Sequence, residues 1–178
     1  MRIGVSGTHG TGKTTLVHEL CALLPGHEAV EEPYLLLAED GYDFADPPSV
    51  EDYRVQLETS LRLLRSSAGD VVFDRTPVDF LAYLAAHGRD VEDVVTAEAL
   101  EPAMSGLDLL VVLPVTAATE RDLPAADLPR LRAAVDAALL EIVREDPLDA
   151  WPDLPVLELA GPPAGRAEAV VRVAAGLP

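Results

Sequence analysis

Short apolar runs alternate with longer amphipathic segments along this chain. The short runs are bounded by Gly, Pro or charged residues, and they cover residues 3–5, 29–30, 71–73, 109–113 and 156–159. They are too short for helices, and runs of this kind are typical of strands that are buried on both faces of a parallel sheet. The pattern therefore predicts five buried parallel strands.

Helical periodicity occupies most of the intervals between these runs. The predicted helices cover about residues 13–24, 91–100, 129–143 and 164–175, and two more begin after Ser49 and Thr76. Ser49 with Asp52 resembles a capping box, and Pro77 after Thr76 is typical of a first helical position. Strands that alternate with helices predict one α/β domain over residues 1–178, with right-handed crossovers.

Three segments rich in Pro, Asp and small residues are predicted to be loops, at residues 34–48, 114–129 and 147–155. Ligands of open parallel sheets bind beyond the carboxyl ends of the strands. We therefore expect one functional rim, formed by residues 6–13, 31–33, 74–76, 160–163 and the segment that starts at residue 114.

One of these strand ends carries a complete phosphate-binding motif. Residues 7–14 match G-x-x-x-x-G-K-[ST] at every fixed position, after a predicted strand and before a predicted helix. Backbone N–H groups and a helix N-terminus both attract phosphate oxygens there. Lys13, the only lysine, is expected to be exposed and to reach the β and γ phosphates, while Thr14 ligates Mg²⁺. The predicted nucleotide-binding residues are Gly7, Thr8, His9, Gly10, Thr11, Gly12, Lys13, Thr14 and Thr15.

The third strand ends at Asp74, which is expected to assist in holding Mg²⁺. The next residue is Arg75, where hydrolytic ATPases commonly carry a water-activating Glu. Arg75 either faces a phosphate or forms a surface salt bridge with Asp79. The chain contains no asparagine, so it cannot carry the guanine-reading Asn-Lys-x-Asp motif, and ATP is the expected nucleotide.

The segments Glu31-Glu32-Pro33 and Asp74-Arg75-Thr76 resemble elements of a known group. Deoxynucleoside kinases carry Glu-Pro and Glu-Arg-Ser at these places, and thymidylate kinases carry Arg-Glu-Pro and Asp-Arg-Tyr. The chain also resembles a family of bacterial ATP-binding proteins, labelled AAA, that share Glu-Pro and Asp-Arg-x-Pro-x-Asp. The resemblance is carried by the first three strands and implies a three-layer P-loop fold with strand order 2-3-1-4-5.

The resemblance also implies roles for single residues. Glu32 takes the position of the carboxylate that accepts the proton of the acceptor hydroxyl, with Glu31 as a competing candidate. Asp74 assists Mg²⁺, and Arg75 holds either a phosphate on the acceptor or the phosphate in transfer. Gln56 falls where deoxynucleoside kinases carry a base-reading Gln, although it could equally lie on a helix surface. With Lys13, Glu32, Asp74 and Arg75 as the catalytic set, the implied activity is γ-phosphoryl transfer from ATP to a nucleoside- or nucleotide-like acceptor.

Two departures weaken this resemblance. The expected lid, residues 117–132, offers Arg121, Arg130 and Arg132 without the usual Arg-x-x-x-Arg spacing. Thymidylate kinases follow Glu-Pro with two glycines, whereas Tyr34 and leucines follow it here. The alternative function is therefore a P-loop ATPase, or a nucleotide-dependent switch or interaction module.

Composition and charge limit the number of domains and the kinds of partner that we expect. A chain of 178 residues that is 49% hydrophobic can bury one core. A net charge of −18 disfavours bulk nucleic acid and anionic membranes as partners. The chain has neither a leader pattern nor an apolar run of membrane-spanning length, so a cytoplasmic location is expected. ATP, Mg²⁺ and a small-molecule acceptor are the expected ligands, and a homodimer is left open.

Overall fold

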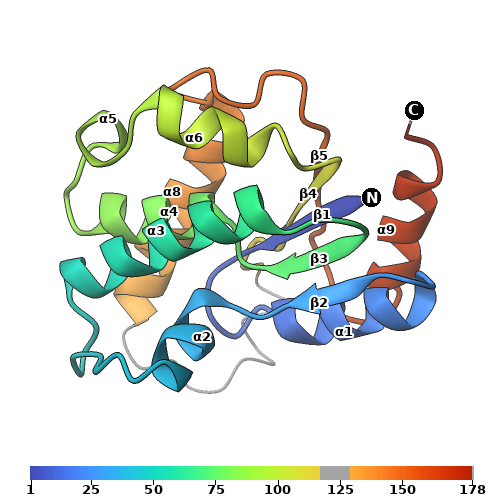
Figure 1. Ribbon diagram of the computed structural model, residues 1–178, viewed down its shortest axis with the longest axis horizontal. Helices are drawn as coiled ribbons and strands as arrows, with labels where there is room; N and C mark the ends of the chain where they lie inside the picture. The colour runs from blue at the N-terminus through green and yellow to red at the C-terminus, as the bar shows by residue number, and fades with distance from the viewer. Residues whose placement is uncertain (117–128, 178) are drawn as a thin grey trace.

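The computed structural model describes residues 1–116 and 129–177. It contains a five-stranded sheet in the order β2-β3-β1-β4-β5, and every pair of neighbours is parallel (Figure 1). The predicted strand order is therefore confirmed. The strands are β1 (Arg2–Ser6), β2 (Glu28–Val30), β3 (Val71–Asp74), β4 (Leu109–Val112) and β5 (Val156–Glu158).

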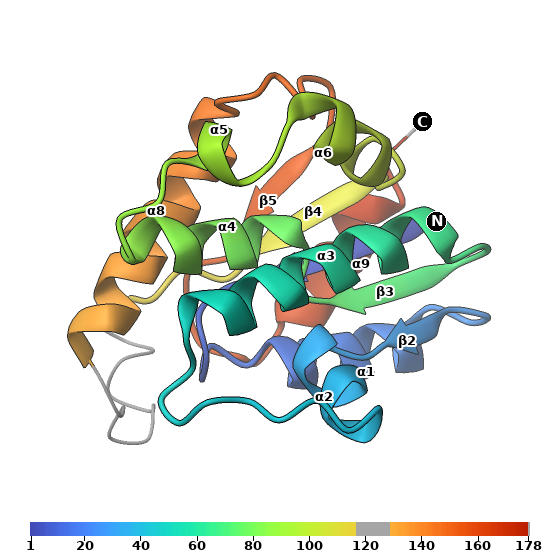
Figure 2. The ribbon, with the colours of Figure 1, turned by 60° about the vertical axis from the view of Figure 1, so that its left-hand side comes forward.

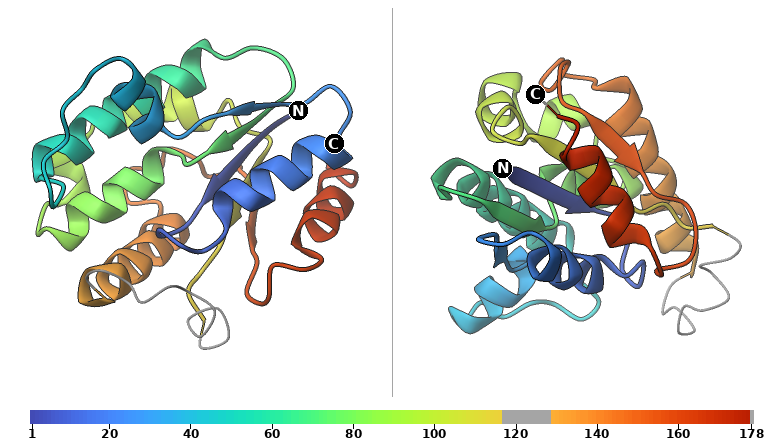
Figure 3. Two further views of the ribbon diagram at one scale, coloured as in Figure 1. Left: turned by 90° about the horizontal axis from the view of Figure 1, so that it is seen from below. Right: turned by 90° about the vertical axis from the view of Figure 1, so that its right-hand side faces the viewer.

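Helices cover both faces of this sheet. Those described are α1 (Lys13–Leu23), α2 (Pro33–Glu39), α3 (Val50–Ser66), α4 (Pro77–Ala86), α5 (Val91–Val94), α6 (Ala97–Met104), α8 (Pro129–Glu145) and α9 (Arg166–Ala174). Figure 3 shows α1 and α9 together on one face, with α3, α4 and α8 on the other. The result is the three-layer arrangement that the alternating pattern predicts. None of the described helices is long and apolar enough to cross a bilayer.

Alternation along the strands divides the core into two parts. Ile3 and Val5 of β1 pack with Leu16 and Leu20 of α1 and with Val170 of α9. The opposite face of the sheet contributes Phe73, Leu110 and Val112 to a second cluster, formed with side chains of α3, α4 and α8. Both faces of the central strands are apolar because helices cover both of them.

The two predicted helix starts are confirmed. Ser49 Oγ accepts a hydrogen bond from the Asp52 amide at 3.2 Å, and Asp52 Oδ2 accepts one from the Ser49 amide at 2.6 Å. At the start of α4, the Thr76 amide donates to Asp79 Oδ2 at 2.9 Å. These contacts satisfy amides that the first turn of a helix leaves without intrahelical partners.

Two predicted segments differ from the structure. Residues 34–48 were expected to form a loop, yet α2 occupies the first part of this segment, beginning at Pro33 (Figure 2). Proline suits the first turn of a helix because its missing N–H is not needed there. The single helix expected over residues 91–100 is divided into α5 and α6. Thr96 caps α6 by accepting a hydrogen bond from the Ala99 amide at 3.3 Å, so the chain is extended between the two helices.

Gly4 supports a close approach between β1 and the start of α4. A Cβ atom at Gly4 would lie 2.5 Å from Thr76 Cγ2 and 3.1 Å from a methyl group of Leu107. Thr76 cannot easily turn away, because it is fully buried and its hydroxyl is hydrogen-bonded to Ser6 Oγ at 2.8 Å. An alanine at this position must therefore displace packed atoms.

We predict that Gly4→Ala lowers the free energy of unfolding by about 1–3 kcal/mol, as overpacked cores do. Gly176→Ala is the matched control, because its added Cβ would meet only ordinary contacts at 3.5 Å and beyond. The control should change stability by less than about 0.5 kcal/mol. Urea unfolding followed by circular dichroism measures both, and equal midpoints for the two variants would contradict the packing argument.

Candidate functional site

The phosphate loop runs between β1 and α1 and depends on two of its glycines. Gly12 has φ +87°, a left-handed conformation that side chains disfavour. A Cβ on Gly7 would lie 2.8 Å from the backbone oxygen of Leu113, at the end of β4. The loop is thereby held against the neighbouring strand end, with its amides and the start of α1 available to an anion.

Lys13 was expected to be exposed, and this prediction is wrong. The side chain is only 5% exposed, and Nζ donates a hydrogen bond to the Thr8 backbone oxygen at 2.8 Å. Burial lowers the pKa of Lys13 to about 8, with a further contribution from Arg75, while Asp79, Asp74 and Glu32 oppose the shift. The ammonium folds back over the loop because a desolvated cation needs an acceptor. The oxygen of a bound phosphate would be a stronger hydrogen-bond acceptor for this ammonium than the Thr8 oxygen.

Thr14 and Asp74 lie together beside the loop. Thr14 Oγ1 donates to Asp74 Oδ2 at 2.6 Å. Burial raises the pKa of Asp74, although the hydrogen bond from Thr14 and the charge of Lys13 oppose that shift. The other oxygen, Oδ1, is buried and has no hydrogen-bond partner among the described residues. A hydroxyl beside a carboxylate with an unused oxygen fits a hard cation such as Mg²⁺, which prefers oxygen ligands.

Arg75 follows β3 and joins it to the phosphate loop and to Glu32, the residue before α2. Its Nε donates to Glu32 Oε2 at 2.6 Å, and its Nη1 lies 3.3 Å from both Asp79 Oδ1 and the Gly7 oxygen. Burial acts to lower the pKa of Arg75, but Tyr83, Asp79 and Glu32 together raise it, so the guanidinium stays charged. The backbone of Arg75 has φ +77°, an unfavourable conformation that is often found at functional sites.

The contacts of Arg75 decide only part of what was expected of it, and its role toward a phosphate stays a prediction. The ion pair with Asp79 forms, but it is buried within the rim rather than on the surface. Glu31, the competing carboxylate, is exposed, whereas Glu32 pairs with Arg75 and lines a cavity.

This cavity has a volume of about 540 Å³ and lies next to the phosphate loop. Tyr53 and Tyr83 stack in its wall with ring centroids 4.6 Å apart. Its lining residues are His9, Glu32, Tyr34, Asp46, Pro47, Pro48, Tyr53, Gln56, Arg75, Phe80, Tyr83 and Leu131. The cavity is thus apolar and aromatic along its walls, with ionic groups where it meets the loop. We refer to it below as the rim cavity.

Gln56 lies in the wall of the rim cavity rather than on an exposed helix surface. Its side chain is 6% exposed, and Nε2 donates to the Asp52 backbone oxygen at 3.0 Å. This contact holds the carboxamide, while Oε1 accepts no hydrogen bond from any described residue. The carboxamide can therefore accept and donate toward a bound molecule.

Arg166 was missed by the sequence analysis. It begins α9, is 5% exposed, and donates to the Thr11 oxygen of the phosphate loop at 2.7 Å and to the Gly161 oxygen at 2.5 Å. Burial lowers the pKa of Arg166, and its Nε has no partner among the described residues. The residue therefore links the phosphate loop to the loop after β5. No local pattern signals this role.

The lid arginines are only partly described. Arg121 lies outside the described residues, as does most of the expected lid. Arg130 is exposed in the first turn of α8, and Arg132 is buried in the same helix, close enough to Asp136 to affect its pKa. The lid role of all three remains a prediction.

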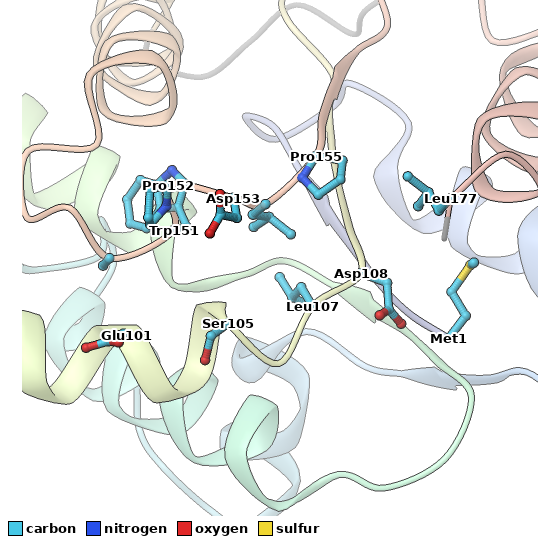
Figure 4. A pocket seen from close by; sticks show the side chains of 12 residues that line it. Met1, Glu101, Ser105, Leu107, Asp108, Trp151, Pro152, Asp153, Pro155 and Leu177 are labelled. Carbon is cyan, nitrogen blue, oxygen red and sulfur yellow. The ribbon is translucent and has the colours of Figure 1, made fainter.

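A second cavity, of about 610 Å³, lies far from these groups. Met1, Asp108 and Pro155 line it, and they precede β1, β4 and β5 (Figure 4). It therefore opens at the amino ends of the strands, opposite the phosphate loop. None of the predicted site residues lines it.

The fold, the phosphate loop and the strand-end Asp-Arg pair define a protein of the P-loop class. Residues 2–152 match the AAA domain family, and the chain belongs to that family. None of the curated proteins compared with the chain matches it.

Solved structures resemble the chain over nearly its whole length. Deoxyadenosine kinase from M. mycoides with bound dATP has a TM-score of 0.68 at 17% identity, with 99% of this chain and 100% of that one covered. The same enzyme with bound dCTP has a TM-score of 0.64 at 16% identity, and again 99% of this chain and 100% of that one are covered. Thymidylate kinase from Candida albicans has a TM-score of 0.63 at 15% identity, with 97% of this chain and 89% of that one covered. The predicted resemblance in fold to the nucleoside and nucleotide kinase group is confirmed.

We predict that Lys13→Ala weakens ATP binding by roughly 10- to 100-fold. Hydrogen bonds to a charged group contribute about 1.5–3 kcal/mol, and each 1.4 kcal/mol is a tenfold change in affinity. The matched control is Arg172→Ala, which removes an exposed positive charge from α9. Isothermal titration calorimetry with ATP and Mg²⁺ measures affinity, and a circular-dichroism melt verifies the fold. Equal affinities for the parent and the Lys13 variant would overturn the assignment.

Proposed function

We propose that the chain is an ATP-dependent phosphotransferase that moves the γ-phosphoryl group to a small nucleoside- or nucleotide-like acceptor. The observation that carries the proposal is the position of the Glu32–Arg75 pair. Glu32 lines the rim cavity, and Arg75 bridges from it to the backbone oxygen of Gly7 in the phosphate loop. A carboxylate at the junction of a cavity and a phosphate loop suits a general base for an acceptor hydroxyl.

The phosphate loop supplies the groups that ATP needs. Loop amides and the start of α1 would hold the phosphates, and Lys13 would exchange the Thr8 oxygen for a phosphate oxygen. Thr14 and Asp74 would hold Mg²⁺, which neutralises phosphate charge when bound. ATP is preferred in this proposal because the chain lacks the asparagine of the guanine-reading motif.

The chain's own residues then favour transfer by position and charge. As the acceptor oxygen bonds to the γ phosphorus, the bond from that phosphorus to the β–γ bridging oxygen breaks and ADP leaves. The hydroxyl proton passes to Glu32 Oε1, while Oε2 remains hydrogen-bonded to Arg75 Nε. Lys13 and Arg75 oppose the negative charge of the phosphates. Positioning supplies much of the rate in such reactions.

Similarity in fold to nucleoside and nucleotide kinases supports this proposal. One of the similar structures is a deoxyadenosine kinase with bound dATP, and another is a thymidylate kinase. The competing function, hydrolysis of ATP, has less support. The residue after Asp74 is an arginine held by two carboxylates, and the rim cavity would have no role in a reaction with water.

We predict that Glu32→Gln slows phosphoryl transfer by about 10²–10⁴-fold, the usual contribution of a general base. Nucleotide affinity should change little, because Glu32 contacts Arg75 and not the loop that would hold the phosphates. Single-turnover transfer to a nucleoside mixture gives the rate, and calorimetry gives the affinity. Glu31→Gln is the matched control, since it makes the same change at the adjacent exposed carboxylate.

Transfer at near the parent rate by the Glu32 variant would remove Glu32 from the chemistry. If only the Glu31 variant were inactive, the general base would be Glu31 and not Glu32. A thermal melt of each variant separates loss of chemistry from loss of fold.

We predict that Gln56→Leu weakens binding of the acceptor by about 1–3 kcal/mol while ATP affinity stays unchanged. The substitution leaves a polar edge of the bound ring without its hydrogen-bond partner, and that unpaired group carries the cost. Glu58→Leu is the control, because Glu58 is exposed on the same helix. The KM for the acceptor, measured at saturating ATP, gives the result. Equal KM values for the two variants would exclude Gln56 from acceptor binding.

A further inference from the structure

The hydrogen bonds of Arg75 restrict what its guanidinium can bind. Arginine commonly grips a phosphate through two parallel N–H groups on one edge of the guanidinium. Nε, on one edge, is already bonded to Glu32 at 2.6 Å, and Nη1, on the other, lies 3.3 Å from Asp79 Oδ1. Only Nη2, which both edges share, is left. Nη2 can donate a single hydrogen bond to a hydroxyl or ring oxygen. Neither edge of the guanidinium has two N–H groups available for a bidentate contact with a phosphate.

The charge around the acceptor end of the rim cavity is negative. Glu32 and Asp46 are the two carboxylates of the lining and Arg75 is its one guanidinium, so the formal charge of these three groups is −1. Asp79 does not line the cavity, but it pairs with Arg75 from behind and offsets the positive charge of that residue. Arg75 is the only arginine or lysine among the described residues that line the cavity. An acceptor that already carries a phosphate would therefore meet net repulsion, and like charges placed together at a binding site strongly suppress binding.

The remaining walls suit an uncharged planar ring. Tyr53 and Tyr83 form a stacked pair, and Phe80 lies beside them in the lining. Aromatic walls bind flat rings by burial and stacking. Gln56 provides the polar contact that such a ring can use to fix its orientation.

We infer that the acceptor carries no negative charge: it is an unphosphorylated, ring-bearing alcohol of nucleoside size, and a nucleoside monophosphate is rejected. This inference rests on the proposed phosphotransferase function and narrows its acceptor class. The product is then a phosphate monoester. Any step that uses this product must accept a monoester, and the step that supplies the acceptor must yield a free hydroxyl.

The test compares each acceptor with its own phosphate ester. The common ribonucleosides and deoxyribonucleosides, and the 5′-monophosphate of each, are assayed for phosphoryl transfer from ATP with Mg²⁺. Binding of the same pairs is measured by calorimetry in the presence of a non-hydrolysable ATP analogue. The unphosphorylated member of the best pair should be favoured by about 100-fold or more, as expected when like charges oppose one another.

Two variants test whether the negative charge of the cavity causes the discrimination against the monophosphate. Asp46→Asn removes one carboxylate from the cavity lining and should reduce the discrimination against the monophosphate by about three- to tenfold, since exposed charges act through a high dielectric. Asp43→Asn is the matched control, because it removes the same charge from an exposed position of the same segment that does not line the cavity. The control should leave the discrimination unchanged.

The outcomes separate this inference from the function on which it rests. Preferential transfer to a monophosphate would overturn the inference and leave the phosphotransferase function standing. If no pair is phosphorylated, the proposed function fails, and the binding measurements still decide the inference: preference for the nucleosides supports it, and equal or tighter binding of the monophosphates overturns it. Equal effects of the two asparagine substitutions would exclude Asp46 as a source of discrimination.

Discussion

The carboxylate of Asp79 holds the rim of this protein together. Oδ1 accepts the Gly7 amide at 2.9 Å and faces Arg75 Nη1 at 3.3 Å, while Oδ2 accepts the Thr76 amide at 2.9 Å. The side chain is 1% exposed, and a buried charge is tolerated only with such partners. One carboxylate thus joins the phosphate loop, the start of α4 and Arg75. The position of Glu32 follows in turn, because Glu32 is paired with the same arginine.

The phosphate loop is held from its other side by Arg166. Asp79 binds the first residue of the loop from α4, and Arg166 binds the Thr11 oxygen from α9, on the opposite face of the sheet. The loop is therefore fixed between the two helical layers. Preorganised amides of this kind cost little reorganisation when an anion binds. The burial of Lys13 fits the same arrangement, since the loop offers its ammonium the Thr8 oxygen.

Much of the fold and the phosphate loop could be predicted from the sequence, because both depend on short local patterns. The phosphate loop has fixed spacing, and the central strands β1, β3 and β4 are buried and apolar, so these elements follow from pattern, and the strand order follows from family resemblance. The predicted burial is wrong for the edge strands β2 and β5, whose residues are mostly exposed. Arg166 could not be found in this way, because its partner Thr11 lies 155 residues earlier. The helix α2 was missed because three consecutive leucines, residues 35–37, show no helical period. Lys13 was misjudged because exposure depends on how the loop folds, which the motif does not encode.

We propose that the phosphoryl group of ATP passes to an alcohol in the rim cavity. Phosphorus NMR of the protein with ATP, Mg²⁺ and a mixture of nucleosides tests it most directly, because each phosphorus product has its own resonance. We expect the resonance of a phosphate monoester to grow in step with that of ADP. ADP accompanied only by inorganic phosphate, at a rate that the nucleosides do not change, would contradict it.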